Sequence, residues 1–125
     1  MATTKSFTSL EQSRKLADIL PLESADMCFK CLDEDPYDIV CRPYSEWKDE
    51  YKGLLISRDA DVIPCWSLAA LLVTLNFPSL IQNKEDKWEI CVIDDKKDEY
   101  IEMTASNPID ACVEMIIKLH KQKLL

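Results

Sequence analysis

Glycine is almost absent from this chain, since Gly53 is the only one in 125 residues. Loops that cradle nucleotide phosphates need several glycines, because their backbone approaches the ligand where a Cβ atom would clash. The sequence therefore excludes glycine-rich phosphate-binding loops. Histidine is equally scarce, with His120 alone, which limits the general bases and metal ligands available to a catalytic site.

Positive charge is also in short supply. Lysine and arginine total 15 against 23 acidic residues, which gives a net charge of −8. An acidic surface repels phosphate backbones, so we expect no direct nucleic-acid binding. A positively charged start followed by an apolar run, the pattern of an export signal, does not occur, and we expect a cytoplasmic protein.

Long apolar runs are missing as well. The uncharged stretch from 62 to 83 is the longest candidate, but Pro64, Asn76 and Pro78 interrupt it. A membrane-spanning helix needs about 18 or more continuous apolar residues. We therefore expect no membrane association and predict a buried central helix instead, which begins near Pro64, includes residues 66–75 and ends near Asn76.

The remaining pattern predicts two outer helices and two hairpins. Ser9 with Gln12, or Thr8 with Glu11, forms a capping box for a first helix that ends at Pro21. Asn107 as cap and Pro108 in the first turn begin a last helix. The expected strands are residues 27–32 with 37–42, residues 88–93 with 100–104, and an optional strand at 54–56.

These elements predict a single α+β domain over residues 1–125, with residues 1–7 loosely ordered. An antiparallel sheet of four or five strands packs against three helices, and the central helix is the most buried; whether both hairpins join this one sheet stays open. The stripe that the last helix buries consists of Ile109, Cys112, Val113, Ile116 and Leu119.

Six cysteines raise the question of disulfides or metal binding: Cys28, Cys31, Cys41, Cys65, Cys91 and Cys112. Without an export signal we expect reduced, mostly buried thiols. Cys28 and Cys31 form a CxxC motif, but strand residues three apart point to opposite faces and no second ligand pair accompanies them. We predict no metal site and no cofactor, with a small metal or thiol protein as the alternative.

His120 follows Ile116 by four residues and is therefore expected on the apolar stripe of the last helix. A histidine at a helix end more often complements the helix dipole than acts as a base. The acidic pairs Asp33 with Asp35, Asp59 with Asp61 and Asp94 with Asp95 lack the further ligands and the glycine of a calcium loop. We expect no catalytic residues and no enzyme.

Aromatic residues gather in the charged segment after the first hairpin: Tyr44, Trp47 and Tyr51. Aromatic side chains amid charges are typical of protein-binding surfaces. We predict these three as protein-contact residues, although they could equally form a lid over the core.

Three stretches carry a resemblance to known sequences: LEQSRKLADILPLESADM at 10–27, IPCWSLAALL at 63–72 and NPIDACVEMIIKL at 107–119. They resemble a group of small uncharacterised proteins encoded in phages, prophages and mobile elements of gut Bacteroidetes. The resemblance implies a genomic setting, with no activity and no site residues attached to it.

Together these observations predict a non-catalytic accessory protein of a phage or mobile element that acts through contact with a protein partner. One alternative is an acidic mimic of DNA that inhibits a host DNA-binding protein, because the net charge is −8. The chain is expected to be a monomer, or a homodimer that pairs through a free sheet edge.

Overall fold

The computed structural model describes residues 6–32, 35–40, 62–76, 78–94 and 98–124. Its elements are α1 (Leu10–Ala17), a 3-10 turn (Leu22–Ser24), β1 (Met27–Leu32), β2 (Asp35–Val40), β3 (Val62–Cys65), α3 (Leu68–Thr74), β4 (Ser79–Gln82), β5 (Trp88–Asp94), β6 (Glu99–Ala105) and α4 (Pro108–Lys121). The predicted α+β class is confirmed, with three α-helices in these ranges. Each of these helices is too short or too polar to cross a bilayer.

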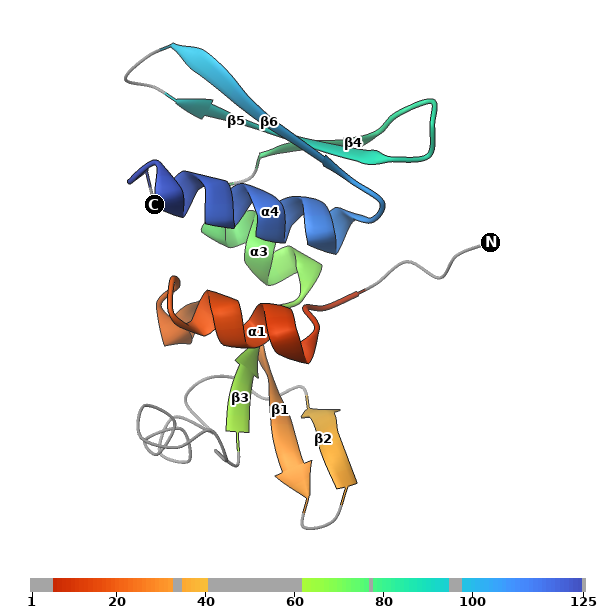
Figure 1. Ribbon diagram of the computed structural model, residues 1–125, viewed down its shortest axis with the longest axis vertical. Coiled ribbons are helices and arrows are strands. Elements are labelled where there is room, and N and C mark those ends of the chain that lie inside the picture. The colour runs from red at the N-terminus through yellow and green to blue at the C-terminus, as the bar shows by residue number, and fades with distance from the viewer. Residues whose placement is uncertain (1–5, 33–34, 41–61, 77, 95–97, 125) are drawn as a thin grey trace.

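The strands form two antiparallel sheets, ordered β2-β1-β3 and β4-β5-β6. The prediction of one sheet of four or five strands is therefore wrong, although both predicted hairpins are present as β1–β2 and β5–β6. Figure 1 shows the reason, because helices α1, α3 and α4 lie between the two sheets. The hairpins cover opposite sides of this helical layer, so their strands do not meet edge to edge.

Strand β3 corrects the predicted start of the central helix. Residues Val62–Cys65 pair with β1, so that Pro64 lies opposite Cys28 in an edge strand. Proline is tolerated at a sheet edge as well as in a first helical turn, and its position in the sequence does not separate the two. The helix begins only at Leu68, after Ser67, whose hydroxyl accepts a hydrogen bond from the Ala70 amide.

Burial also differs from the prediction for the central helix. Of the residues in α3, only Leu71 is buried, and Val73 is 61% exposed. The absence of charge in this segment therefore does not mean burial on every side. Helix α4 is the most buried of the described helices: its buried residues are Pro108, Ile109, Ala111, Cys112, Val113, Met115, Ile116 and Leu119, which include the whole predicted stripe.

The main core fills the space between α4 and its neighbours. Helix α4 packs against β5 and β6 on one side and against α3 and α1 on the other. Ile90 of β5, Leu16 of α1 and Leu71 of α3 are fully buried against it. A smaller cluster, formed by Phe29, Ile63 and Cys65, lies beneath the β2-β1-β3 sheet. Cys28 of β1 belongs to the main core and its neighbour Phe29 to the smaller cluster, so β1 buries side chains on both of its faces.

The predicted helix caps are confirmed, and one carboxylate links them. Ser9 and Gln12 form the capping box of α1, and Asn107 caps α4 through the Asp110 amide at 2.8 Å. The Asp110 carboxylate accepts a hydrogen bond from Gln12 Nε2 at 2.7 Å and another from Asn107 Nδ2, also at 2.7 Å. Asp110 therefore ties together the N-termini of two helices that are distant in sequence.

The described start of the chain is also held in place. Leu68 donates its amide to the Ser6 carbonyl, and Thr8 donates its amide to the Trp66 carbonyl at 3.0 Å. The buried Thr8 hydroxyl lies 2.7 Å from the Ser13 hydroxyl and accepts a hydrogen bond from the Trp66 amide. Two other predictions are not tested: the strand at 54–56 lies outside the described residues, and of the loose segment at 1–7 only Ser6 and Phe7 are described.

Buried thiols make folding sensitive to alkaline pH. Burial raises the pKa of Cys112 from 9.0 to about 12. Burial likewise raises the pKa of Cys65 to about 11, although hydrogen bonds from Thr8 and Ser13 oppose the rise. Above pH 9.0 the unfolded chain releases the thiol proton, whereas the folded chain keeps it. The stabilisation is therefore complete below pH 9.0 and decreases as the pH rises from there toward the raised pKa of the folded chain.

We predict that Asp110→Ala lowers the free energy of unfolding by about 1–3 kcal/mol, because Gln12 and Asn107 lose a charged acceptor. Urea denaturation measures the change. Glu85→Ala removes an exposed carboxylate and should change stability by less than about 0.5 kcal/mol. Equal effects of the two substitutions would contradict the structural role of Asp110.

We also predict that the free energy of unfolding falls as the pH rises above 9.0. Each buried thiol contributes up to about 1.4 kcal/mol per pH unit to this slope. Cys112→Ala should give a shallower slope than the parent chain over the same pH range, whatever its stability at neutral pH. Urea denaturation at a series of alkaline pH values tests this, and parallel slopes would refute it.

Candidate functional site

The contact residues predicted from the sequence, Tyr44, Trp47 and Tyr51, lie outside the described residues. Their role therefore stays a prediction.

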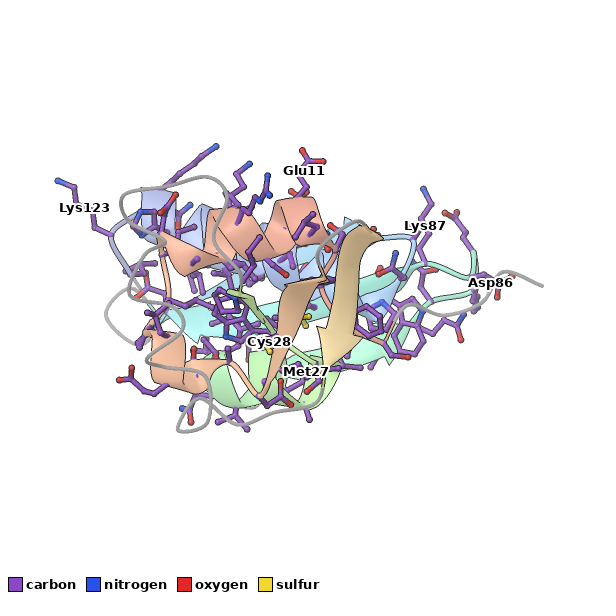
Figure 2. The ribbon with its side chains drawn as sticks, turned by 90° about the horizontal axis from the view of Figure 1, so that it is seen from below. Glu11, Met27, Cys28, Asp86, Lys87 and Lys123 are labelled. Carbon is purple, nitrogen blue, oxygen red and sulfur yellow. The ribbon has the colours of Figure 1, made fainter. Side chains whose placement is uncertain are left out.

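The thiol and histidine candidates do not come together. Cys28 is a residue of β1, and its side chain is buried in the main core. Figure 2 shows it toward the middle of the molecule. His120 is exposed in the last turn of α4, so its expected position on the apolar stripe is wrong. The helix turns about 100° per residue, and the neighbour Leu119 takes the buried position instead. Within the described ranges, no three side chains of the histidine, cysteine or acidic type form a group able to hold a metal ion.

The outer face of the β4-β5-β6 sheet is the best candidate for a binding surface. Alternation along β5 turns Ile90 into the core and leaves Glu89, Cys91 and Ile93 on the opposite face. Cross-strand pairing then fixes their neighbours: Ile93 lies opposite Tyr100, Cys91 opposite both Ser79 and Glu102, and Glu89 opposite both Ile81 and Thr104. We call this set of outward positions the outer-face site.

Large apolar side chains are exposed on the outer-face site. Ile93 and Tyr100 are 55% and 70% exposed, and Ile81 on β4 is 55% exposed. Direct cross-strand partners have Cβ atoms only about 4.5–5.5 Å apart, so Ile93 and Tyr100 form one contiguous apolar patch. Contiguous exposed apolar surface is more informative than isolated residues and marks protein-binding sites.

A hollow of about 360 Å³ adjoins this apolar pair. Leu75, Asn76 and Pro78 form one wall, and Cys91, Ile93 and Tyr100 form the other. Strand β4 stops pairing at Ser79 opposite Cys91, so β5 continues beyond its partner and leaves this space. Asn76 adopts a left-handed conformation, with φ of 59°, which ends α3 at the rim of the hollow. The site thus combines an apolar patch with an adjacent depression.

Carboxylates share the outer face and the hairpin end with the apolar pair. Glu89 and Glu102 project from the same face of β5 and β6, and the exposed Asp98 and Glu99 lie at the end of the hairpin. Described basic residues do not appear among the outward positions of these three strands. The outer-face site is therefore an apolar centre with an acidic rim, which favours a partner that offers apolar side chains flanked by lysine or arginine.

Cys91 is the thiol within this site, and its environment disfavours ionisation. Partial burial raises the pKa of Cys91 above its ordinary value, and the nearby Glu102 carboxylate raises it further. Thiolates, not thiols, act as nucleophiles and metal ligands. Cys91 therefore contributes a small apolar surface at neutral pH and is poorly suited to covalent chemistry.

The sequence contained a signal for this site that composition alone does not reveal. In the alternating pattern of β5 and β6, Ile93 and Tyr100 occupy positions where a half-covered sheet normally carries polar residues. The exposure of these two residues can be inferred only when the covered face of the sheet is known, because Ile93 by itself could equally belong to the core.

We predict that Cys91 reacts with iodoacetamide more slowly than an unstructured cysteine at neutral pH and faster as the pH rises past 9.0. Buried Cys112 should react only on unfolding. Mass spectrometry of peptides after timed alkylation gives both rates. Rapid modification of Cys91 at neutral pH would instead indicate an activated thiolate.

Comparison of this chain with protein-family models, with curated proteins and with solved structures finds no significant match. The site is therefore interpreted from its own geometry and chemistry.

Proposed function

We propose that this protein is a non-catalytic protein-binding module and that the outer-face site is its docking surface. The observation that carries the proposal is the cross-strand pair of Ile93 and Tyr100, both more than half exposed and beside a hollow of about 360 Å³. Tyrosine and large aliphatic side chains gathered around a pocket are the usual anchors of protein interfaces.

The charge around this pair specifies the partner. Glu89 and Glu102 share the outer face with the apolar centre, so the preferred partner segment carries an apolar side chain beside basic residues. The raised pKa of Cys91 and the exposed position of His120 support a binding role over a catalytic one. The resemblance of three stretches to phage and mobile-element proteins is consistent with an accessory protein that acts on a host or phage factor.

A second candidate is an acidic inhibitor that occupies the DNA-binding surface of a host protein. The net charge of −8 and the exposed Asp98, Glu99 and Glu102 at one end of the β5–β6 hairpin favour it. Lys118 of α4 lies among these carboxylates and reduces their field, so the apolar docking role is preferred. The two roles differ in salt dependence, because a complex held by charge weakens steeply as salt increases.

We predict that replacing Ile93 and Tyr100 with serine weakens the partner complex by at least tenfold, the loss of one or more hot-spot contacts. Tagged protein purified from its native host yields the candidate partner by mass spectrometry, and calorimetry on the purified pair then measures the affinity. Both substitutions are at exposed positions, so the melting temperature should change little.

Two variants serve as controls for this experiment. Val73→Ser removes an apolar side chain of similar exposure, 61%, on α3, outside the outer-face site. Trp47→Ala tests the aromatic segment predicted from the sequence. Loss of binding with Trp47→Ala but not with Ile93→Ser and Tyr100→Ser would transfer the docking role to the aromatic segment. Recovery of the tagged protein alone would overturn the proposal.

A further inference from the structure

Strand β6 has the only long, proline-free edge among the described strands. The two edges of the first sheet, β2 and β3, contain Pro36 and Pro64, and β4 spans four residues directly after Pro78. Proline and short length are the usual means of preventing edge-to-edge pairing. Strand β6 spans seven residues, and none of its backbone groups bonds to another described segment beyond β5.

A groove runs beside this free edge. Two hollows, of about 590 and 410 Å³, lie between β6 and α4, and both are lined by Lys118 and Gln122. Glu99 and Glu102 line the first, and Met103 lines the second. Together the two hollows touch β6 from Glu99 to Met103. An extended strand added to the β6 edge would lie along this groove.

We propose that the occupant is a second copy of this chain, paired antiparallel through β6 about a two-fold axis at Met103. Two pairing registers, each centred near the middle of β6, place the inward-facing residues of one chain opposite the inward-facing residues of the other. An axis at Glu102 places two glutamates directly opposite one another, which is unfavourable. An axis at Met103 instead places Met103 opposite its own copy and Glu102 opposite Thr104 of the second chain.

The position of α4 fits this arrangement. Helix α4 packs against β5 and β6 alike, so its axis lies over the line midway between these two strands. The helix axis is therefore displaced from β6 toward β5 by about half of the distance between neighbouring strands. The two-fold axis would lie on the other side of β6, away from β5, again at half of the distance between neighbouring strands. The two α4 helices would therefore be about 10 Å apart, which is the spacing of packed helices. Sheet pairing and helix packing can form together without moving either element.

The charges on α4 are complementary to those of its own copy. Glu114, Ile117, Lys118 and Lys121 line the hollow that Met103 also lines. The dyad through Met103 makes the two α4 helices antiparallel, which brings the Glu114 end of each flank toward the Lys121 end of the other. Glu114 and Lys121 are exposed, and the half-buried Ile117 lies between them. A self-complementary patch of this kind is what a two-fold interface requires.

The pairing would produce one continuous six-stranded sheet with two outer-face sites on the same side. It differs from the proposed docking role, because it uses the edge of β6 and the flank of α4, and the two surfaces share only Tyr100 and Glu102 at their border. Docking uses the outward positions Ile93, Tyr100 and Ile81. Failure of one proposal therefore leaves the other intact.

Sedimentation velocity of the full chain over a wide range of concentration tests the pairing. We expect a monomer–dimer equilibrium that Lys121→Glu weakens about tenfold, since two symmetric ion pairs become repulsive. Glu114→Lys alone should weaken it similarly, and the double charge swap should restore it. Lys87→Glu makes the same change of charge in the β4–β5 turn, at the opposite end of the molecule from Lys123 in Figure 2, and should have no effect.

Two further measurements complete the design. Circular dichroism melting of each variant shows that it is folded, and amide exchange over residues 99–105 should slow as the dimer forms. A chain that stays monomeric at every concentration would overturn the proposal. A dimer that neither single reversal weakens, or that the charge swap does not restore, would do so as well, because it would use another surface.

Discussion

The burial of α4 on two opposite sides is the constraint on which the rest of the structure depends. Helix α4 buries residues on more than one side: Ile109, Ile116 and Leu119, and also Ala111 and Met115. A single neighbouring layer cannot cover all of these positions. One side is covered by β5 and β6, and the other by α3 and α1. The second sheet then covers α1 from below (Figure 1). The order of layers follows from the number of faces that must be buried.

The same constraint determines which surfaces remain available for binding. Because α4 occupies the inner face of the β4-β5-β6 sheet, the outer face is left open to solvent, and its apolar pair Ile93 and Tyr100 with it. Because α4 also returns antiparallel to β6, the free edge of β6 acquires a charged helical flank. The proposed docking face and the proposed self-pairing edge are thus two consequences of one packing arrangement, and they differ in chemistry.

The buried polar groups stabilise the fold and offer little reactivity. Asp110 joins the caps of α1 and α4, and Thr8 with Ser13 holds the start of the chain against β3. Burial keeps the Cys65 and Cys112 thiols protonated, so they pack as small apolar groups.

Local sequence determined the helices and strands that can be recognised from residues close together in the chain. The Ser9 capping box, the Asn107–Pro108 start of α4 and the alternation of β5 and β6 each depend on residues within a few positions of one another, and each prediction was confirmed. Tertiary structure decided the rest. Pro64 suits a helix start or a sheet edge equally, and only pairing with β1 selects the strand. Likewise, Ile93 is apolar in any context, and only the position of α4 on the opposite face of the sheet makes it a surface residue, because burial is a property of the packed neighbours.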